Sequence, residues 1–396
     1  DQQPANDVPV LDVGALRFEG VAPTNVLMIS IDTLRQDHLD PYGDRQLTPN
    51  LGRYLTEGVH APDTMQCSNW TMASVSCTLL GRDPVEHGFL PRLESQREVA
   101  YPDGTRFLAV ELAEAGFRTV LSSRNGFFSD RVHNDQGYDT VLGGLPNAAA
   151  QLAGTLAFVQ EQEDGTPWFA HVHVVEPHAP YDAVEFEVGR DALAPIDYDL
   201  ADGADMVRLR ADLPSMSDED AALVQAHVRL AYDAEVRSVD DQIARALSGW
   251  DEAGYLDDTL VVFWSDHGEQ LWEHGHFTHA YDLNYGENNA LFAVWAKNLV
   301  PGVWTGPVSA QDIAPTVLTV LDQAVPEEMT GFSIGLAPAD RVRRAVSVAR
   351  GEGHNSLRRG DLKLIATWSG QRSLFDKSLD PGETTDRFDP TNPEHM

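Results

Sequence analysis

The sequence has few cysteines and few basic residues. Two Cys among 396 residues are too few for a disulfide framework or for a cysteine-rich zinc site. The chain has 28 Lys and Arg against 62 Asp and Glu, which gives a formal net charge of −34 at pH 7. A surface this acidic repels nucleic acids and anionic membranes, so we expect neither as a partner. We interpret the acidic excess as a solvated surface.

Long hydrophobic runs are also missing. No apolar stretch approaches the roughly 20 residues that a membrane-spanning helix needs, so we expect no membrane insertion. The chain begins with DQQPANDVPV, a polar segment without the apolar core of a signal peptide. We therefore expect a processed protein that is periplasmic or secreted. The sequence predicts no particular oligomeric state.

Apolar runs alternate with amphipathic segments along most of the chain. Hydrophobic residues make up 42% of the sequence, which is ample for a buried core. The pattern predicts strands over 25–32, 117–123, 168–175, 259–266 and 290–296. It predicts helices over 48–58, 70–80, 105–116, 148–162, 216–248 and 309–323. Continuous apolar strands separated by helices indicate an α/β fold, an α/β/α sandwich around a large, mostly parallel mixed sheet.

Changes in the residue pattern divide the chain into three parts. Residues 1–23 form a polar lead, and residues 24–339 form the α/β domain that carries the chemistry. From about residue 340 short strands and turns follow one another, which predicts a small C-terminal antiparallel sheet over 340–396. The segment 181–222 is rich in acidic and small residues, and we expect it at the rim of the pocket.

Polar residues follow three of the predicted strands. Asp32 ends the first, Asp266 and His267 end another, and Glu176 and His178 follow a third. Ligands of α/β sheets bind beyond the carboxyl ends of the strands. Carboxylate and imidazole groups together suit zinc or a similar divalent ion. A single Asp after a strand is also a common turn or cap residue, which is the alternative for Asp32.

Three further polar residues allow two interpretations each. His171 and His173 lie on one strand face, and a hydrogen-bonded core residue is the better interpretation for His171. For His173 the choice stays open. Thr71 opens a predicted helix, where a hydroxyl is an ordinary N-cap. Beside a divalent metal, the same hydroxyl is easier to deprotonate and can act as a nucleophile.

Six segments in order resemble the sulfatase-type members of the alkaline phosphatase superfamily. They are NVLMISIDTLRQDHLDPYG, LTPNLGRYLTEGV, WTMASVSCTLLGRDPVEHG, VHVVEPHAPY, SDHGEQLWEHGHFTHAYDLNYGE and GDLKLIATWSGQRSLFDKSLDPGETTDRF, covering roughly residues 24–388. The resemblance implies the fold described above and a small anionic ester as the substrate. It also implies a role for each of several individual residues. Asp32, Asp266 and His267 match metal ligands, Thr71 matches the nucleophile, and His178 and His279 match residues that hold the anionic group.

The sequence departs from that family at the nucleophile. A typical sulfatase has Cys or Ser there, converted to formylglycine, with an Arg that here corresponds to Val75. Thr71 cannot be converted in this way, so we expect no formylglycine. The family's Lys-x-His is also missing, and SSRNG stands in its place. Asn125 within it is a candidate for substrate contact, with a turn residue before Gly as the alternative.

These departures favour phosphate over sulfate chemistry. Thr nucleophiles in this superfamily are associated with phosphodiesterases, and the Asp266-His267 pair resembles its zinc members. We expect a metal-dependent hydrolase of phosphate mono- or diesters that forms a phosphothreonine. Thr71 would also be a ligand of the metal, and His279 would assist catalysis. Zinc is the favoured ion, with Ca, Mg and Mn as alternatives.

Three other functions stay open. They are a sulfatase that works without formylglycine, a phosphoethanolamine-type transferase, and a degenerate sulfatase-like module that binds an anion without turning it over. The two cysteines, Cys67 and Cys77, lie on either side of Thr71. They form either a disulfide in an oxidising compartment or two buried thiols.

Overall fold

A large mixed sheet forms the centre of the molecule. The computed structural model describes residues 10–88, 100–129, 131–183, 186–348, 350 and 352–392. Within these residues the sheet has eight strands, in the order β14 (Gly302–Val303), β4 (Val59–His60), β13 (Phe292–Trp295), β9 (Thr259–Ser265), β3 (Asn25–Ile31), β8 (Trp168–Val174), β6 (Arg118–Ser123) and β7 (Thr140–Leu142). Neighbours from β9 to β7 pair in parallel, and β13 runs antiparallel to both of its neighbours. The predicted mostly parallel mixed sheet is therefore confirmed.

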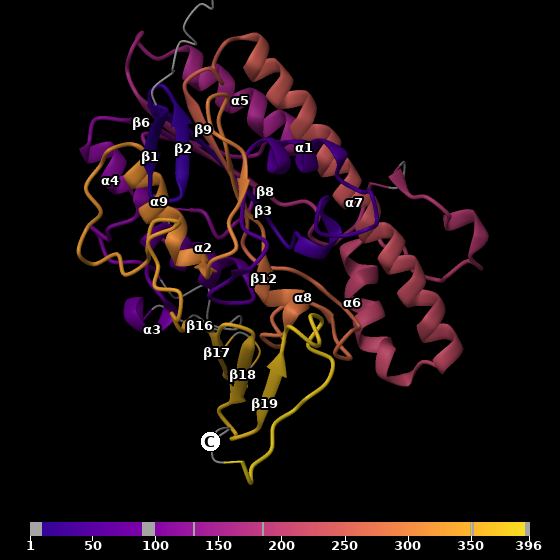
Figure 1. Cartoon of the computed structure of the whole chain (residues 1–396). Helices are drawn as coiled ribbons and strands as arrows, with labels where there is room; N and C mark the ends of the chain where they lie inside the picture. The colour runs from indigo at the N-terminus through magenta and orange to yellow at the C-terminus, as the bar shows by residue number, and fades with distance from the viewer. Residues whose placement is uncertain are drawn as a thin grey trace, which may run out of the picture.

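Helices cover both faces of this sheet (Figure 1). One face packs against α2 (Thr71–Leu80), α4 (Leu108–Glu114) and α9 (Ile313–Val320). The other face packs against α1 (Pro49–Glu57), α5 (Ala148–Gln160) and α7 (Asp218–Glu252). Successive side chains of a strand point to opposite faces, so Met28 of β3 joins the first core and Ile29 the second. This double burial explains the continuous apolar strands, and it confirms the predicted α/β/α sandwich.

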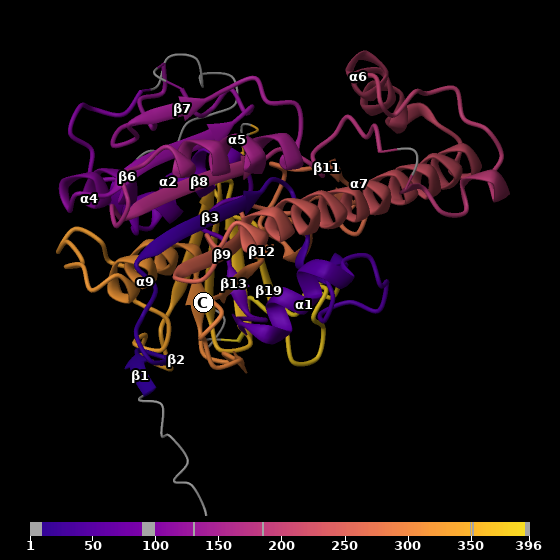
Figure 2. The same cartoon turned by 90° about the horizontal axis from the view of Figure 1, so that it is seen from above.

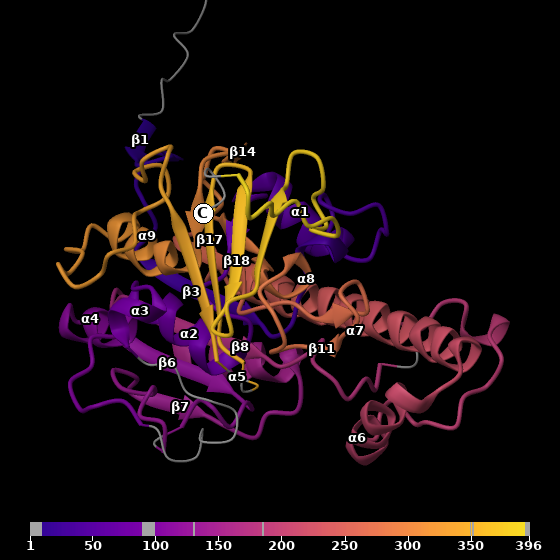
Figure 3. The same ribbon diagram turned by 90° about the horizontal axis from the view of Figure 1, so that it is seen from below.

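The C-terminal part forms the small antiparallel sheet expected there. Its strands are β16 (Arg343–Ser347), β17 (His354–Arg359), β18 (Leu362–Thr367) and β19 (Arg372–Asp376), paired in chain order. Figure 3 shows this sheet in front of the main domain. Asp63, which precedes β5 (Thr64–Met65), lies 2.9 Å from Nη2 of Arg343 and 2.5 Å from Nη1 of Arg358. These ion pairs join the C-terminal sheet to the main domain, because Asp63 lies between β4 and β5.

Smaller elements complete the fold. Within the predicted polar lead, residues 10–19 form a hairpin of β1 (Val10–Val13) and β2 (Leu16–Glu19), and residues 1–9 lie outside the described part. Leu16 and Phe18 of this hairpin are fully buried. The other short elements are β10 (Gln270–Leu271), β11 (Phe277–Thr278), β12 (Asn289–Ala290), β15 (Val308–Ser309), α3 (Pro84–His87), α6 (Gly203–Asp212), α8 (Tyr285–Asn288) and the 3-10 turns Gln36–His38, Arg190–Ala192, Leu213–Ser215 and Ala310–Asp312.

Helix α6 belongs to the segment 181–222 that we expected at the rim of the pocket. Figure 2 shows it beside one end of the long helix α7, away from the centre of the main sheet. Asp202 caps it by accepting hydrogen bonds from the N–H groups of Ala204 and Asp205. Among the described residues, no helix is both long and apolar enough to cross a membrane.

Candidate active site

Three central strands end at one cluster of buried polar side chains. Asp32 follows β3, Asp266 and His267 follow β9, and His173 lies near the end of β8. One ligand atom from each of Asp32, His173 and Asp266 lies within 4.8 Å of the others. These strands are parallel neighbours, so their carboxyl ends meet at one edge of the sheet. The structure therefore brings the three predicted metal ligands together and adds His173.

Unpaired atoms show that this cluster fits a cation. Oδ1 of Asp32 and Oδ2 of Asp266 are buried, and neither has a hydrogen-bond partner among the described residues. Nε2 of His267 lies 3.5 Å from the first and 3.6 Å from the second. Nδ1 of His267 lies 2.9 Å from the carbonyl of Gly268, which can only accept, so the proton is on Nδ1 and the lone pair of Nε2 faces the carboxylates. Two carboxylates and neutral imidazole suit a divalent ion such as zinc.

The pKa shifts of the clustered side chains also fit a bound cation. Burial opposes ionisation of Asp32, but its hydrogen bond to His173 and the nearby imidazoles lower its pKa to about 2. Burial, together with the negative charge of Asp32, raises the pKa of Asp266 well above its usual range. Burial also lowers the pKa of His267 and favours the neutral ring that binds metals. Two carboxylates at such close range destabilise one another until a cation lies between them.

The hydroxyl of Thr71 faces this cluster. Thr71 is the first residue of α2, and the N-cap position belongs to Trp70. Oγ1 of Thr71 lies 3.5 Å from Oδ2 of Asp32 and 3.4 Å from Nε2 of His267. The alternative interpretation of Thr71 as a helix cap is therefore not what the structure shows. Its side chain lies at the positive end of a helix and beside potential metal ligands.

A chain of buried hydrogen bonds orients His173. The hydroxyl of Tyr138 lies 3.0 Å from Nδ1 of His171, whose Nε2 lies 2.9 Å from Oγ of Ser30. The same Oγ lies 2.9 Å from Nδ1 of His173, so Nε2 of His173 points toward Asp32 at 3.4 Å. His171 is thus the hydrogen-bonded core residue that we expected. His173 is paired with Ser30 in the adjacent strand, and this pairing directs the His173 ring toward Asp32. The sequence does not show which strands are neighbours or in what register they pair.

Asn125 makes the turn contact that was one interpretation of it, and it also contacts Asp32. Its Oδ1 accepts a hydrogen bond from the N–H of Phe127, which is a turn contact. Its Nδ2 donates to Oδ2 of Asp32 at 3.0 Å. Glu176, which follows β8, forms an ion pair with Arg124 at 2.7 Å. Asn125 therefore reaches the metal cluster, while Glu176 neutralises a neighbouring arginine.

His178 and His279 lie on the open side of the cluster. The ring centres of His267 and His279 are 4.4 Å apart, and those of His279 and His178 are 5.0 Å apart. Burial and the two neighbouring imidazoles lower the pKa of His279 well below its ordinary value. Nδ1 of His279 lies 3.3 Å from Oε2 of the buried Glu269, a contact that sequence reasoning did not identify. Glu269 orients the ring, because a carboxylate accepts from an imidazole N–H.

A cavity of about 550 Å³ opens over these residues. It is lined by Asp32, Thr71, Asn125, His178 and His279 among the predicted site residues, and by Trp70, Arg124, Phe127, Val175, Glu176, Ala179, Pro180, Asp182, Ala201 and Glu235. Asp182 and Ala201 come from the segment 181–222, so this segment does reach the pocket. The volume suits a small molecule.

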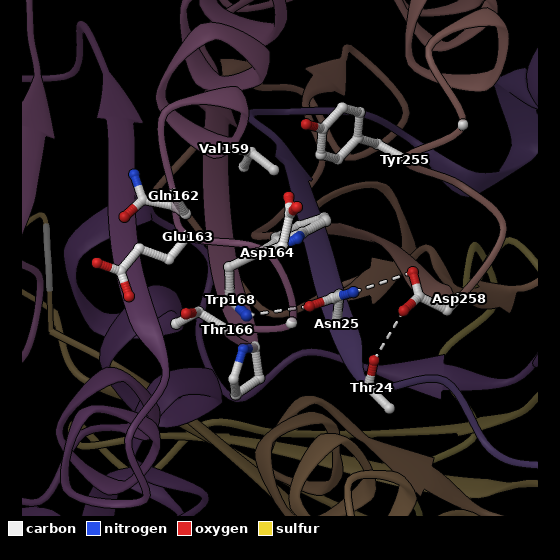
Figure 4. A pocket seen from close by; sticks show the side chains of 13 residues that line it. Thr24, Asn25, Val159, Gln162, Glu163, Asp164, Thr166, Trp168, Tyr255 and Asp258 are labelled. Carbon is white, nitrogen blue, oxygen red and sulfur yellow. Dashed lines mark hydrogen bonds between the residues drawn. The ribbon is translucent and has the colours of Figure 1, made fainter.

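Another cavity, of about 420 Å³, lies at the opposite ends of the strands (Figure 4). Thr24 and Asn25 donate hydrogen bonds to Asp258, and the N–H of Trp168 donates to Oδ1 of Asn25. These polar groups satisfy one another where strands β3, β8 and β9 begin. None of the predicted site residues lines this cavity, and we assign it a structural role.

The two cysteines form a disulfide, Cys67–Cys77. Both are fully buried, and the bond connects the segment before α2 to the middle of that helix. It resolves the choice that the sequence left open. Neither thiol is therefore free for conversion to formylglycine, and the disulfide fastens the segment that carries Thr71.

Fold and site together define an α/β/α protein with a buried Asp-His-Asp cluster, compatible with a divalent metal, at the carboxyl edge of its sheet. The sequence family described as "Sulfatase" matches residues 24–323. The chain belongs to the sulfatase family. It is therefore a hydrolase of the sulfatase-like type within the alkaline phosphatase superfamily, and the degenerate non-enzymatic alternative is not supported.

Two curated relatives span most of the chain. It is 22% identical to an arylsulfatase of Clostridium perfringens over 438 aligned positions, which cover 91% of this chain and 89% of the relative. It is 27% identical to the multifunctional alkaline phosphatase superfamily protein PehA of Trinickia caryophylli, covering 78% and 76% of the two chains.

Solved structures share the fold. The structure of BT4656 in complex with its substrate D-glucosamine-2-N,6-O-disulfate superimposes with a TM-score of 0.74 at 19% identity, covering 93% of this chain and 94% of the other. The phosphonate monoester hydrolase of Silicibacter pomeroyi gives a TM-score of 0.71 at 19% identity, covering 94% and 92%. This agreement confirms the α/β/α architecture with its C-terminal sheet.

Proposed function

We propose that the protein hydrolyses small phosphate mono- or diesters with Thr71 as the nucleophile. The observation that supports this proposal is the Thr71 hydroxyl, which faces both Asp32 and His267 at the wall of the 550 Å³ cavity. Oγ1 of Thr71 would bond to phosphorus while the bond to the leaving alcohol oxygen breaks. Water would then attack phosphorus in line and release the free Thr71 hydroxyl together with phosphate, or with a phosphate monoester when the substrate is a diester.

Asp32, Asp266 and His267 would hold one divalent cation, with His173 and Thr71 as further ligands. We favour zinc, because the donors are carboxylates and neutral imidazoles. When bound, such an ion would make the Thr71 hydroxyl easier to deprotonate and would offset negative charge on a phosphoryl oxygen. Asn125 would keep Asp32 in position through the hydrogen bond to Oδ2.

His178 and His279 would hold the remaining oxygens of the ester group. Both line the cavity that contains Thr71, and their rings are adjacent. His279 would also protonate the leaving oxygen, since Glu269 beside its Nδ1 stabilises the positive charge that the ring acquires on taking up a proton. An anionic substrate in the cavity favours that protonated ring.

The choice between phosphate and sulfate esters rests on how the covalent intermediate on Thr71 would be broken down. A sulfated formylglycine hydrate expels sulfate by elimination from its second hydroxyl, and a sulfated threonine has no second hydroxyl. Water can attack the phosphorus of a phosphothreonine directly. The fold shared with phosphonate monoester hydrolases is consistent with chemistry at phosphorus. The second candidate is sulfate ester hydrolysis without formylglycine, which the arylsulfatase relative favours.

A substrate panel tests this ranking. The purified protein would be assayed with the para-nitrophenyl esters of phosphate, phenylphosphonate and sulfate and with the symmetric phosphate diester, each in the presence of Zn, Mn, Mg or Ca. We expect the highest kcat/KM on a phosphorus ester. A higher kcat/KM on the sulfate would reverse the ranking and leave the same residues as a sulfatase site.

We also propose that the protein is periplasmic or secreted. The Cys67–Cys77 disulfide supports this location, because such bonds persist in oxidising compartments.

A further inference from the structure

A smaller cavity adjoins the catalytic cavity, and two arginines line it. It has a volume of about 270 Å³ and shares His178, Ala179, Pro180 and His279 with the larger one. Arg210 of α6 and Arg350, between β16 and β17, contribute the positive charge. The two cavities therefore meet at the histidine pair that borders the ester site.

Arg210 forms no ion pair in the described part of the chain, although its charge acts on Glu269, which lines the same cavity. Its Nε is buried and has no hydrogen-bond acceptor, and within the described ranges no carboxylate forms an ion pair with it. Arg208 on the same helix is the contrast, because it contacts Asp205 at 3.2 Å and Asp197 at 3.4 Å. Arg210 therefore places a positive charge beside the catalytic cavity of a chain whose net charge is −34.

Arg350 is held at the same cavity by uncharged groups. Its Nε donates to the carbonyl oxygen of His279 at 3.1 Å, and its guanidinium carbon lies 4.4 Å from the ring centre of Tyr281. Neither contact neutralises its charge. Glu269 also lines this cavity, but its Oε2 is directed at Nδ1 of His279, and in the described part of the chain no ion pair joins it to either arginine. Burial raises the pKa of Glu269 well above its usual range, and the charges of Arg210 and Arg350 oppose that rise.

We propose that Arg210 and Arg350 bind a second anionic group on the alcohol portion of the substrate. The protein would then select esters that carry a carboxylate, sulfate or phosphate in addition to the ester group that is cleaved. This inference rests on the proposed function, because it assumes that the ester group lies beside Thr71. A molecule placed there reaches the arginines by passing His178 and His279, which border both cavities.

The chemistry of the two side chains fits this role. A guanidinium presents several N–H donors in one plane, which match two oxygens of a carboxylate, sulfate or phosphate. The surrounding acidic surface repels anions, so local positive charge at the cavity is needed to admit a substrate with two anionic groups. An anion bound there would also supply the acceptor that the buried Nε of Arg210 lacks.

Binding of two non-hydrolysable probes tests the inference without turnover. Phenylphosphonate and meta-carboxyphenylphosphonate differ only in the second anionic group. Their affinities would be measured by calorimetry on the purified protein, on Arg210→Gln and Arg350→Gln, and on Arg208→Gln as the matched control from the same helix. We expect the unmodified protein and the control to bind the carboxylated probe about tenfold more tightly, as a charge-assisted pair of hydrogen bonds allows.

Arg210→Gln should remove this preference and leave phenylphosphonate affinity within about twofold, because neutral Gln keeps a donor but loses the charge. A preference that survives in Arg210→Gln, or its absence from the unmodified protein, would overturn the inference. Failure of the proposed function would appear differently. The Thr71 variants described below would then stay active, whereas the probe preference does not depend on turnover.

Discussion

Nε2 of His267 lies 3.4 Å from Oγ1 of Thr71, although the two residues are 196 positions apart in the chain. His267 follows the central strand β9, and Thr71 begins α2, which packs on one face of the sheet. The contact therefore joins the end of a core strand to the start of a core helix. It places the proposed nucleophile within reach of the proposed metal ligands.

Replacing the Thr71 hydroxyl should remove activity and leave the fold intact. We expect Thr71→Ala to lower kcat by about a thousandfold or more, because the nucleophile is lost, and Thr71→Ser to keep substantial activity. Thr78→Ala is the matched control on the same helix, since that hydroxyl donates only to the carbonyl of Ser74. Circular dichroism would verify folding. Wild-type activity in Thr71→Ala would exclude Thr71 as the nucleophile.

Removing the metal should inactivate and destabilise the protein. Without a cation, the unpaired oxygens of Asp32 and Asp266 repel one another, so dialysis against a chelator should lower Tm and abolish turnover. Adding back zinc should restore both. Elemental analysis should find less metal in Asp266→Asn than in the parent protein. A chelated, metal-free sample with full activity would contradict this prediction.

The hydrogen-bond chain behind His173 should set metal affinity. We expect Ser30→Ala to weaken metal binding by about 10–100-fold, because Ser30 orients the His173 ring. Tyr138→Phe removes only the outer bond of the chain, to His171, and should have a smaller effect. Competition with a chromogenic chelator would measure both affinities. Equal affinities in Ser30→Ala and the parent would show that His173 is not a ligand.

Glu235 should make stability depend on pH. Burial, opposed in part by hydrogen bonds from the N–H groups of Ala183 and Asp182, raises the pKa of Glu235 from 4.5 to about 7. The stabilisation that the protonated side chain contributes is complete below pH 4.5 and is lost as the pH rises to about 7. Between these values the free energy of unfolding should fall by on the order of 2 kcal/mol.

Urea unfolding of the parent protein and of Glu235→Gln at several pH values would measure this contribution. Gln keeps an oxygen acceptor for the two backbone N–H groups and cannot ionise, so the parent protein should lose stability relative to Glu235→Gln as the pH rises from 4.5 to about 7. Glu252→Gln, at the exposed end of the same helix, is the control for the general effect of removing a negative charge. A difference that stays constant with pH would disprove the shifted pKa.

Much of the fold followed from the order of residues alone. The apolar runs of β3, β8 and β9 mark strands buried on both faces, and such strands leave few alternatives to an α/β/α sandwich. The rule that ligands gather at carboxyl strand ends indicated Asp32, Asp266 and His267. These are local patterns, and a single sequence displays them directly.

The sequence by itself determined the fold class, the residues that end the central strands and the absence of a Cys or Ser at the Thr71 position. The tertiary structure decided which of the other polar residues join them. His173 becomes part of the cluster because β8 pairs with β3 in a register that sets it beside Ser30, and Arg210 reaches the cavity because α6 folds back beside it. Strand register and helix packing depend on contacts between distant segments, and residue spacing along one chain does not encode those contacts locally.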